Sequence, residues 1–271
     1  MMRTTTRLRT ISRMAFAAVL MCVVSAGPAM ATPSTIVWIP SVDIQPYKTV
    51  HLTYDSYLRA RENPDGTRSG AIVDLGLTGG VLPFQKIQAE VGFDLIDQPG
   101  DAGKYPLFFN AKVGTPEDAW FKGSPAVAVG GYNFGTKSGD LRKGDPAATN
   151  QNIVYAIAGK TLPVIGRLEA GYFVGNKKVL VNFAETDGAG NFKSDEKGIL
   201  LSWDRTISEI SDKLWAGVDY QGSDSGIGAF NFGVSWAFAK NVSVIFGYDI
   251  YNEKKSGGEN TYTVQLDINF P

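Results

Sequence analysis

Charged side chains that recur at alternate positions along the chain are the groups with which it could do chemistry. The acids are Asp55, Asp74, Glu90, Asp94, Glu169, Asp204, Asp219, Asp249 and Asp267. The bases in the same pattern are Arg59, Lys112, Lys160 and Arg167. An excess of one sign inside low-dielectric walls concentrates ions of the opposite sign. The chemistry that these residues predict is therefore the selection of ions or small solutes.

Covalent catalysis has much weaker support. The chain has one histidine, His51, which is followed by Leu52 and Thr53 and has no serine two residues on. A serine nucleophile needs a positioned base, and no Gly-x-Ser-x-Gly, His-Glu-x-x-His or phosphate-loop pattern occurs. We expect His51 to be a rim or lumen residue and the protein not to be an enzyme.

The N-terminus has the pattern of an export signal. Arg3, Arg7, Arg9 and Arg13 precede an apolar run over residues 14–24, and a small-x-small cleavage site follows at residues 29–31. We expect residues 1–31 to be a Sec signal that is cleaved off. Its removal would take away Cys22, the only cysteine, and shift the net charge from −1 by four arginines to −5. Mild acidity argues against nucleic acid as a partner, and we expect no cofactor or metal.

The charged positions require strands to place them on one face. The last stretch, residues 260–270, alternates Tyr262, Val264, Leu266, Ile268 and Phe270 with polar residues. Successive side chains of a strand point to opposite faces, so this strand has one apolar and one polar side. About ten residues is also the length that a tilted strand needs to cross a bilayer.

The same unit recurs from Thr49 onward. Alternating runs predict twelve strands, at roughly 49–59, 70–82, 86–97, 105–114, 125–135, 151–161, 167–176, 197–205, 213–221, 229–239, 242–252 and 261–270. Each apolar face is free of charge, which hydrocarbon demands because a mid-bilayer Lys or Arg costs about 2–4 kcal/mol. In the sixth run we assign Ile153, Tyr155 and Ile157 to the outward face. In the fifth run a parity change across Gly130-Gly131 predicts a bulge.

This pattern resembles the outer-membrane β-barrels of Gram-negative bacteria, whose closing strand usually ends in Phe or Trp, here Phe270. The connections after even-numbered strands are mostly short and those after odd-numbered strands longer, as in such barrels. We predict an all-β fold with a single antiparallel transmembrane barrel over residues 49–271. Residues 32–48, interrupted by prolines, would be an irregular segment in the periplasm or inside the barrel. A secreted soluble β-sandwich is the alternative.

The resemblance implies an outer-membrane location, lipid around the barrel and insertion by the barrel assembly machinery with Phe270 as its signal. We expect a monomer that passes small solutes or ions with a weak cation preference. Most acids fall on one predicted arc of the wall, and Lys112, Lys160 and Arg167 fall on the facing arc. The alternatives are a plugged structural, adhesin or scaffold barrel, in which the two arcs neutralise each other, and an outer-membrane enzyme.

Overall fold

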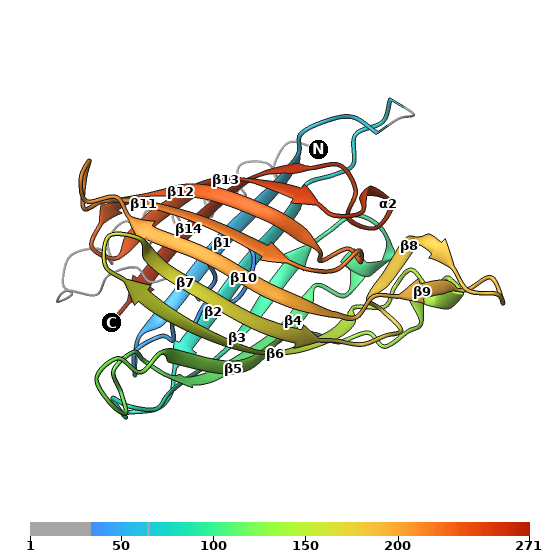
Figure 1. The fold of residues 1–271 in the computed structure, drawn as a ribbon. Coiled ribbons are helices and arrows are strands. Elements are labelled where there is room, and N and C mark those ends of the chain that lie inside the picture. The colour runs from blue at the N-terminus through green and yellow to red at the C-terminus, as the bar shows by residue number, and fades with distance from the viewer. Residues whose placement is uncertain (1–33, 64–65) are drawn as a thin grey trace, which may run out of the picture.

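The chain forms a closed antiparallel barrel of twelve strands, as the sequence predicts (Figure 1). The computed structural model describes residues 34–63 and 66–271, so the expected signal at residues 1–31 lies outside the described residues. The barrel strands are β1 (Val50–Arg59), β2 (Ile72–Gly80), β3 (Gln88–Asp97), β4 (Leu107–Thr115), β5 (Ala126–Gly135), β6 (Asn150–Leu162), β7 (Gly166–Val174), β10 (Lys197–Thr206), β11 (Leu214–Gln221), β12 (Ala229–Ala239), β13 (Val242–Tyr251) and β14 (Thr261–Phe270).

The barrel closes between its first and last strands. β1 pairs with β14 along its whole length, from Val50 opposite Phe270 to Arg59 opposite Thr261. Each remaining pair joins strands that are neighbours among the barrel strands in chain order. Closure removes the free strand edges, whose unpaired backbone groups hydrocarbon could not satisfy.

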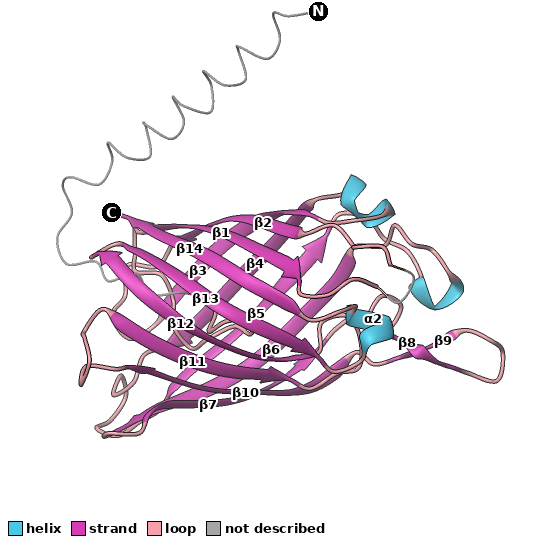
Figure 2. Ribbon diagram, turned by 90° about the horizontal axis from the view of Figure 1, so that it is seen from above, coloured by secondary structure: helices cyan, strands magenta, loops and turns pink. Residues whose placement is uncertain are grey.

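The two ends of the barrel differ in their connections. At the turn end lie the connections after β2, β4, β6, β10 and β12, most of them short, together with Phe270. At the loop end lie the connections after the other strands. The longest of these carries a separate hairpin, β8 (Val181–Thr186) and β9 (Phe192–Ser194), which projects beyond the barrel (Figures 1 and 2). The single turn α2 (Lys254–Gly257) lies beside β8, where Ser256 Oγ accepts from the Phe183 amide at 2.9 Å.

The outer surface carries the apolar belt that the alternation predicts. Its exposed side chains include Leu75, Val91, Phe109, Leu168, Tyr172, Ile199, Phe232, Phe246 and Tyr262. Monomeric soluble proteins rarely expose so large a continuous apolar surface to water. Lipid would cover this belt. Among the described residues, no helix is long and apolar enough to cross a membrane.

β6 corrects one sequence-based assignment. Ile153, Tyr155 and Ile157 were expected to face outward, but they are 0%, 6% and 2% exposed and belong to a packed cluster inside the barrel. The outward residues of β6 are Val154, Ala156 and Ala158. Both faces of this strand are apolar because its inner face also packs against apolar side chains, so hydrophobicity could not distinguish them.

β5 contains the predicted irregularity at a different place. The register with β6 shifts between Tyr132 and Phe134, where Asn133 adopts a left-handed φ of 55°. Asparagine tolerates this conformation better than most residues. The bulge therefore lies at Asn133, after the glycine pair Gly130-Gly131 and not across it. Tyr132 consequently faces the lumen, as Ala126 and Ala128 do. Its ring packs against the internal cluster.

Barrel closure gives a first prediction. Phe270 pairs with Val50 at the seam, so we expect Phe270→Ala to lower the yield of inserted barrel. The measurement is the heat-modifiable band of the membrane fraction on gel electrophoresis. Phe238→Ala is the matched control, because Phe238 is also an exposed aromatic side chain near the turn end, but away from the seam. Equal yields of the two variants would contradict a special role of Phe270.

Candidate functional site

A segment of the chain that precedes β1 lies inside the barrel. Residues 34–45 form a loop that begins beside Glu90, reaches toward the loop end and returns, with Ser41 N bonded to Ser34 O at 3.0 Å. The apolar side chains of the loop are Ile36, Val37, Ile39 and Val42. They are buried against inward residues of β5, β6, β7 and β10. Burial of each such side chain contributes roughly 1.5–3 kcal/mol, so apolar packing helps to hold the loop in the lumen.

The tip of this lumen loop is held by one carboxylate. Asp219 Oδ2 accepts from the amides of Val37 at 2.7 Å, Trp38 at 2.8 Å and Ile39 at 3.4 Å. Its other oxygen accepts from Asn231 Nδ2 at 2.7 Å. Bonds from amides to an ionised acceptor are among the stronger hydrogen bonds of proteins. Asp219 is 1% exposed and is therefore an anchor of the loop, not a free charge of the wall.

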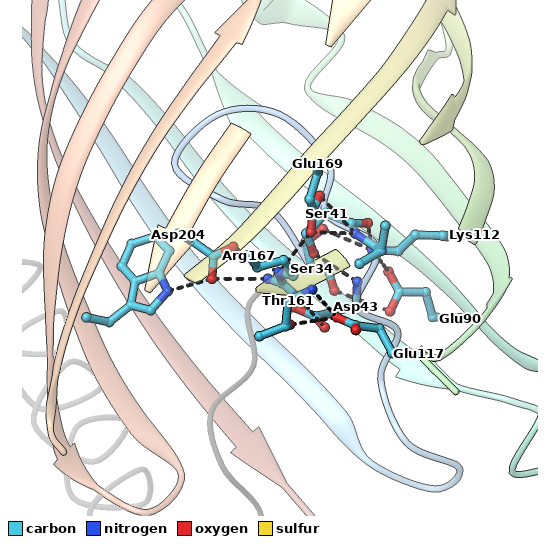
Figure 3. A network of polar contacts seen from close by, with 12 residues as sticks. Ser34, Ser41, Asp43, Glu90, Lys112, Glu117, Thr161, Arg167, Glu169 and Asp204 are labelled. Carbon is cyan, nitrogen blue, oxygen red and sulfur yellow. Dashed lines mark hydrogen bonds and ion pairs between the residues drawn. The ribbon is translucent and has the colours of Figure 1, made fainter. Parts of the chain in front are cut away.

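The returning arm of the loop meets a cluster around Arg167 (Figure 3). The guanidinium lies 2.7 Å from Asp43 Oδ1, 3.0 Å from Glu169 Oε1 and 2.8 Å from Asp204 Oδ1. Glu169 also accepts from the Val42 amide at 3.3 Å. The cation thus joins the lumen loop to β7 and β10, and its charge is neutralised locally.

A second ion pair holds the base of the loop. Lys112 Nζ lies 3.2 Å from Glu90 Oε1 and donates to the carbonyls of Ser34 at 3.0 Å and Ser41 at 3.2 Å. Glu90 Oε2 accepts from the Gln45 amide at 2.7 Å. Lys112 and Glu90 come from neighbouring strands, so this base does not face the acids across the lumen.

The lumen loop leaves a cavity of about 280 Å³ along the wall of β1 to β4. Its lining extends from His51 and Thr78 near the turn end to Gln98 and Ile227 at the loop end. Predicted site residues that line it are Asp55, Asp74, Glu90, Asp94, Lys112 and Asp267. This acid-rich cavity is large enough to accommodate a small solute.

Two further site residues lie at strand ends. Arg59 donates to the carbonyls of Gly257 and Glu259 at the loop end, so it stabilises a loop. Lys160 was expected to face the lumen, but it does not. It pairs across strands with Leu168, which faces outward, and its Nζ lies 2.8 Å from Glu117 Oε2 at the turn end. Partial burial of Glu117 raises its pKa, but the bonds from Lys160 and Thr161 more than offset this and hold it below its usual value.

Two acids of the seam side are enclosed near the wall. Asp249 is 0% exposed and accepts from Thr261 Oγ1 at 2.6 Å. Asp267 lies 3.3 Å from His51 Nε2, and Nδ1 of the same ring lies 2.8 Å from Asn269 Oδ1. The histidine is thus a buried lumen residue with an acid and an amide as its neighbours.

Sequence reasoning missed the partners that come from the lumen loop and from a turn. Asp43 belongs to no strand, so the alternation that identified the other acids could not select it. Glu117 lies in the turn after β4, likewise outside the alternating runs. The amides of Val37 and Trp38 carry no side-chain signal at all. The only indication in the sequence is that residues 36–39 are all apolar and would need cover from solvent.

Solved structures with a similar fold are outer-membrane barrels. KdgM porin aligns with a TM-score of 0.50 at 10% identity, over 82% of this chain and 99% of that one. An outer membrane channel from Pseudomonas putida F1 gives 0.46 at 14%, over 91% and 98%, and outer membrane phospholipase A from Escherichia coli gives 0.42 at 11%, over 85% and 95%. The sequence matches no protein-family model and no curated protein. The class is therefore defined by fold alone: a small, closed, twelve-stranded barrel of the outer-membrane type.

Proposed function

We propose that the chain forms a narrow passage for small solutes or ions across an outer membrane, with a preference for cations. The observation that carries this proposal is the distribution of unpaired charge in the open part of the lumen. Asp55, Asp74 and Asp94 line the cavity, and among the described residues no Lys, Arg or His nitrogen lies within 4 Å of their carboxylates.

The lumen bases are engaged elsewhere. Lys112 contacts Glu90 and two carbonyls of the lumen loop, and Arg167 contacts three acids. Arg59 is bonded to backbone carbonyls of the loop end. The charge that remains toward the cavity is negative, and a wall of one sign attracts ions of the other. The expected separation of acids and bases on facing arcs does not occur, because Lys112 and Arg167 lie beside acids.

Charge removal from the cavity tests the proposal. We expect the double variant Asp74→Asn with Asp94→Asn to lower the cation-to-anion permeability ratio by about threefold to tenfold, because focusing by fixed charge raises local counter-ion concentration at least about tenfold. The measurement is the reversal potential of the purified protein in a planar bilayer under a KCl gradient. Asp101→Asn is the control, since Asp101 lies in an exposed loop paired with Lys104.

Conductance by the wild type with an unchanged permeability ratio in the double variant would contradict the cation preference. No conductance by correctly folded wild type would contradict the passage itself. It would favour the second candidate, a plugged structural or scaffold barrel. The observation that favours this candidate is the lumen loop, whose side chains are packed and bonded inside the barrel.

A further inference from the structure

The cavity beside the lumen loop is kept free by glycines of the wall. A Cβ atom at Gly76 would lie 2.6 Å from Asp94 Oδ1 and 2.6 Å from Thr53 Cγ2. At Gly92 it would lie 2.4 Å from Thr78 Oγ1 and 2.7 Å from Asn110 Oδ1. Neighbouring side chains therefore extend over both glycines. Any other residue at position 76 or 92 would place its own side chain in the same space. The wall presents carboxylate, hydroxyl and amide groups to one open volume.

The acids of this cavity are close together. Asp55 on β1 is directly opposite Asp74 on β2, and directly opposite side chains lie about 4.5–5.5 Å apart at Cβ. Asp94 lies over Gly76, two residues further along β2. Each of Asp55 and Asp94 accepts one hydrogen bond within the wall, from Thr53 at 2.8 Å and from Asn110 at 2.7 Å. Neither bond supplies a positive charge, so the repulsion among the acids is not compensated.

Two buried carboxylate oxygens independently indicate a missing donor. Asp267 lines the same cavity and is 4% exposed; its Oδ1 contacts His51, but its Oδ2 has no hydrogen-bond partner among the described residues. Asp74 Oδ1 is likewise shielded from solvent without a partner in the described structure. A buried acceptor that is left without a donor destabilises the fold, and more so when it is charged. A ligand that carries N–H donors and positive charge would supply the donor that Asp74 Oδ1 lacks.

Aromatic rings complete the lining and indicate what else the ligand carries. Tyr57, Phe108, Tyr155 and Trp38 line the cavity with the acids, and the rings of Trp38 and Tyr57 are 5.3 Å apart. Aromatic faces attract cations and bury apolar groups. The volume of about 280 Å³ lies just below the range of drug-sized sites, so the ligand is small.

We propose that this cavity binds a small organic cation, a primary ammonium ion with an apolar or aromatic body. Its ammonium group lies among Asp55, Asp74 and Asp94, and its body contacts Tyr57 and Phe108. The inference deepens the proposed passage by naming the class of solute, and it rests on that proposal only in requiring that the cavity be reached from solvent.

Binding is tested on the purified full chain in detergent by calorimetric titration with 2-phenylethylammonium chloride. We expect saturable binding to the wild type and at least about tenfold weaker binding to the double variant Asp74→Asn with Asp94→Asn. The reason is that hydrogen bonds between an ammonium group and a carboxylate are stronger than those to a neutral amide. Asp101→Asn should bind as the wild type does. Gly76→Leu, which fills the cavity without changing charge, should also abolish binding, and circular dichroism checks that each variant keeps its barrel.

Absent binding to the wild type, or equal affinity in the charge variant, would overturn the inference. Equal binding of the neutral analogue 2-phenylethanol would overturn it too, since the acids would then contribute nothing. Because titration needs no conductance, the two proposals fail separately. A protein that binds the amine but is silent in a bilayer contradicts the passage, and one that conducts but does not bind the amine contradicts this site.

Discussion

Excision of residues 35–40 is expected to raise the single-channel conductance by roughly an order of magnitude, because a twelve-stranded barrel without internal chain has a lumen wider than that of packed eight-stranded barrels. Ser34 and Ser41 are hydrogen-bonded to each other, so the shortened chain can rejoin with little rearrangement. The excised residues include Ile36, Val37 and Ile39, which fill the middle of the lumen. The measurement is single-channel recording in a planar bilayer at fixed KCl concentration.

The anchor of the loop gives a graded form of the same experiment. Asp219→Ala would leave the amides of Val37 and Trp38 buried without an acceptor, at about 1–3 kcal/mol each. We expect this variant to switch between the wild-type conductance and a larger one, as the loop leaves its place and returns. Removal of residues 187–190, the exposed tip of the β8–β9 hairpin, is the matched control and should change nothing. Unaltered conductance after excision would mean that the lumen loop does not limit the passage.

Substitution of Arg167 by Met is expected to lower the free energy of unfolding by about 3–5 kcal/mol, the usual cost of leaving buried charge without its partner. Asp43, Glu169 and Asp204 all lie within 3.0 Å of this guanidinium. Without it they would repel one another in a partly buried place. The measurement is equilibrium unfolding by urea of the protein in lipid vesicles, followed by tryptophan fluorescence.

Arg205→Met is the matched control. Arg205 lies on β10, the strand that pairs with the strand of Arg167, and like Arg167 it lies near the turn end. It pairs with exposed Glu209, however, and exposed ion pairs contribute at most about 1 kcal/mol. Adding Glu169→Gln and Asp204→Asn to Arg167→Met should recover part of the lost stability, because fewer negative charges then remain. If Arg167→Met unfolds at the same urea concentration as Arg205→Met, the cluster does not hold the lumen loop to the wall.

The barrel itself could be predicted from the sequence because its outer surface obeys a local rule. Within the membrane-spanning part, an outward side chain meets hydrocarbon whatever its neighbours are, so most strands carry the same alternation without outward charge; β6, which is apolar on both faces, is the exception. The strand ranges, the even number of strands and the difference between turns and loops follow from residues that are close in the sequence. Phe232 and Phe246, for example, are outward on this criterion alone.

The arrangement of the lumen was decided by tertiary structure. An inward side chain meets whatever lies opposite, and that can be water, another strand or a segment far away in the sequence. Ile157 faces inward into the same buried cluster as Ile36 and Val42 of the lumen loop. Asp219 is an anchor because it accepts from the amide of Val37, 182 positions away in the sequence. The sequence by itself determined a barrel with an acidic inner face. Which acids are bound by the lumen loop and which face the cavity depends on contacts that no local pattern encodes.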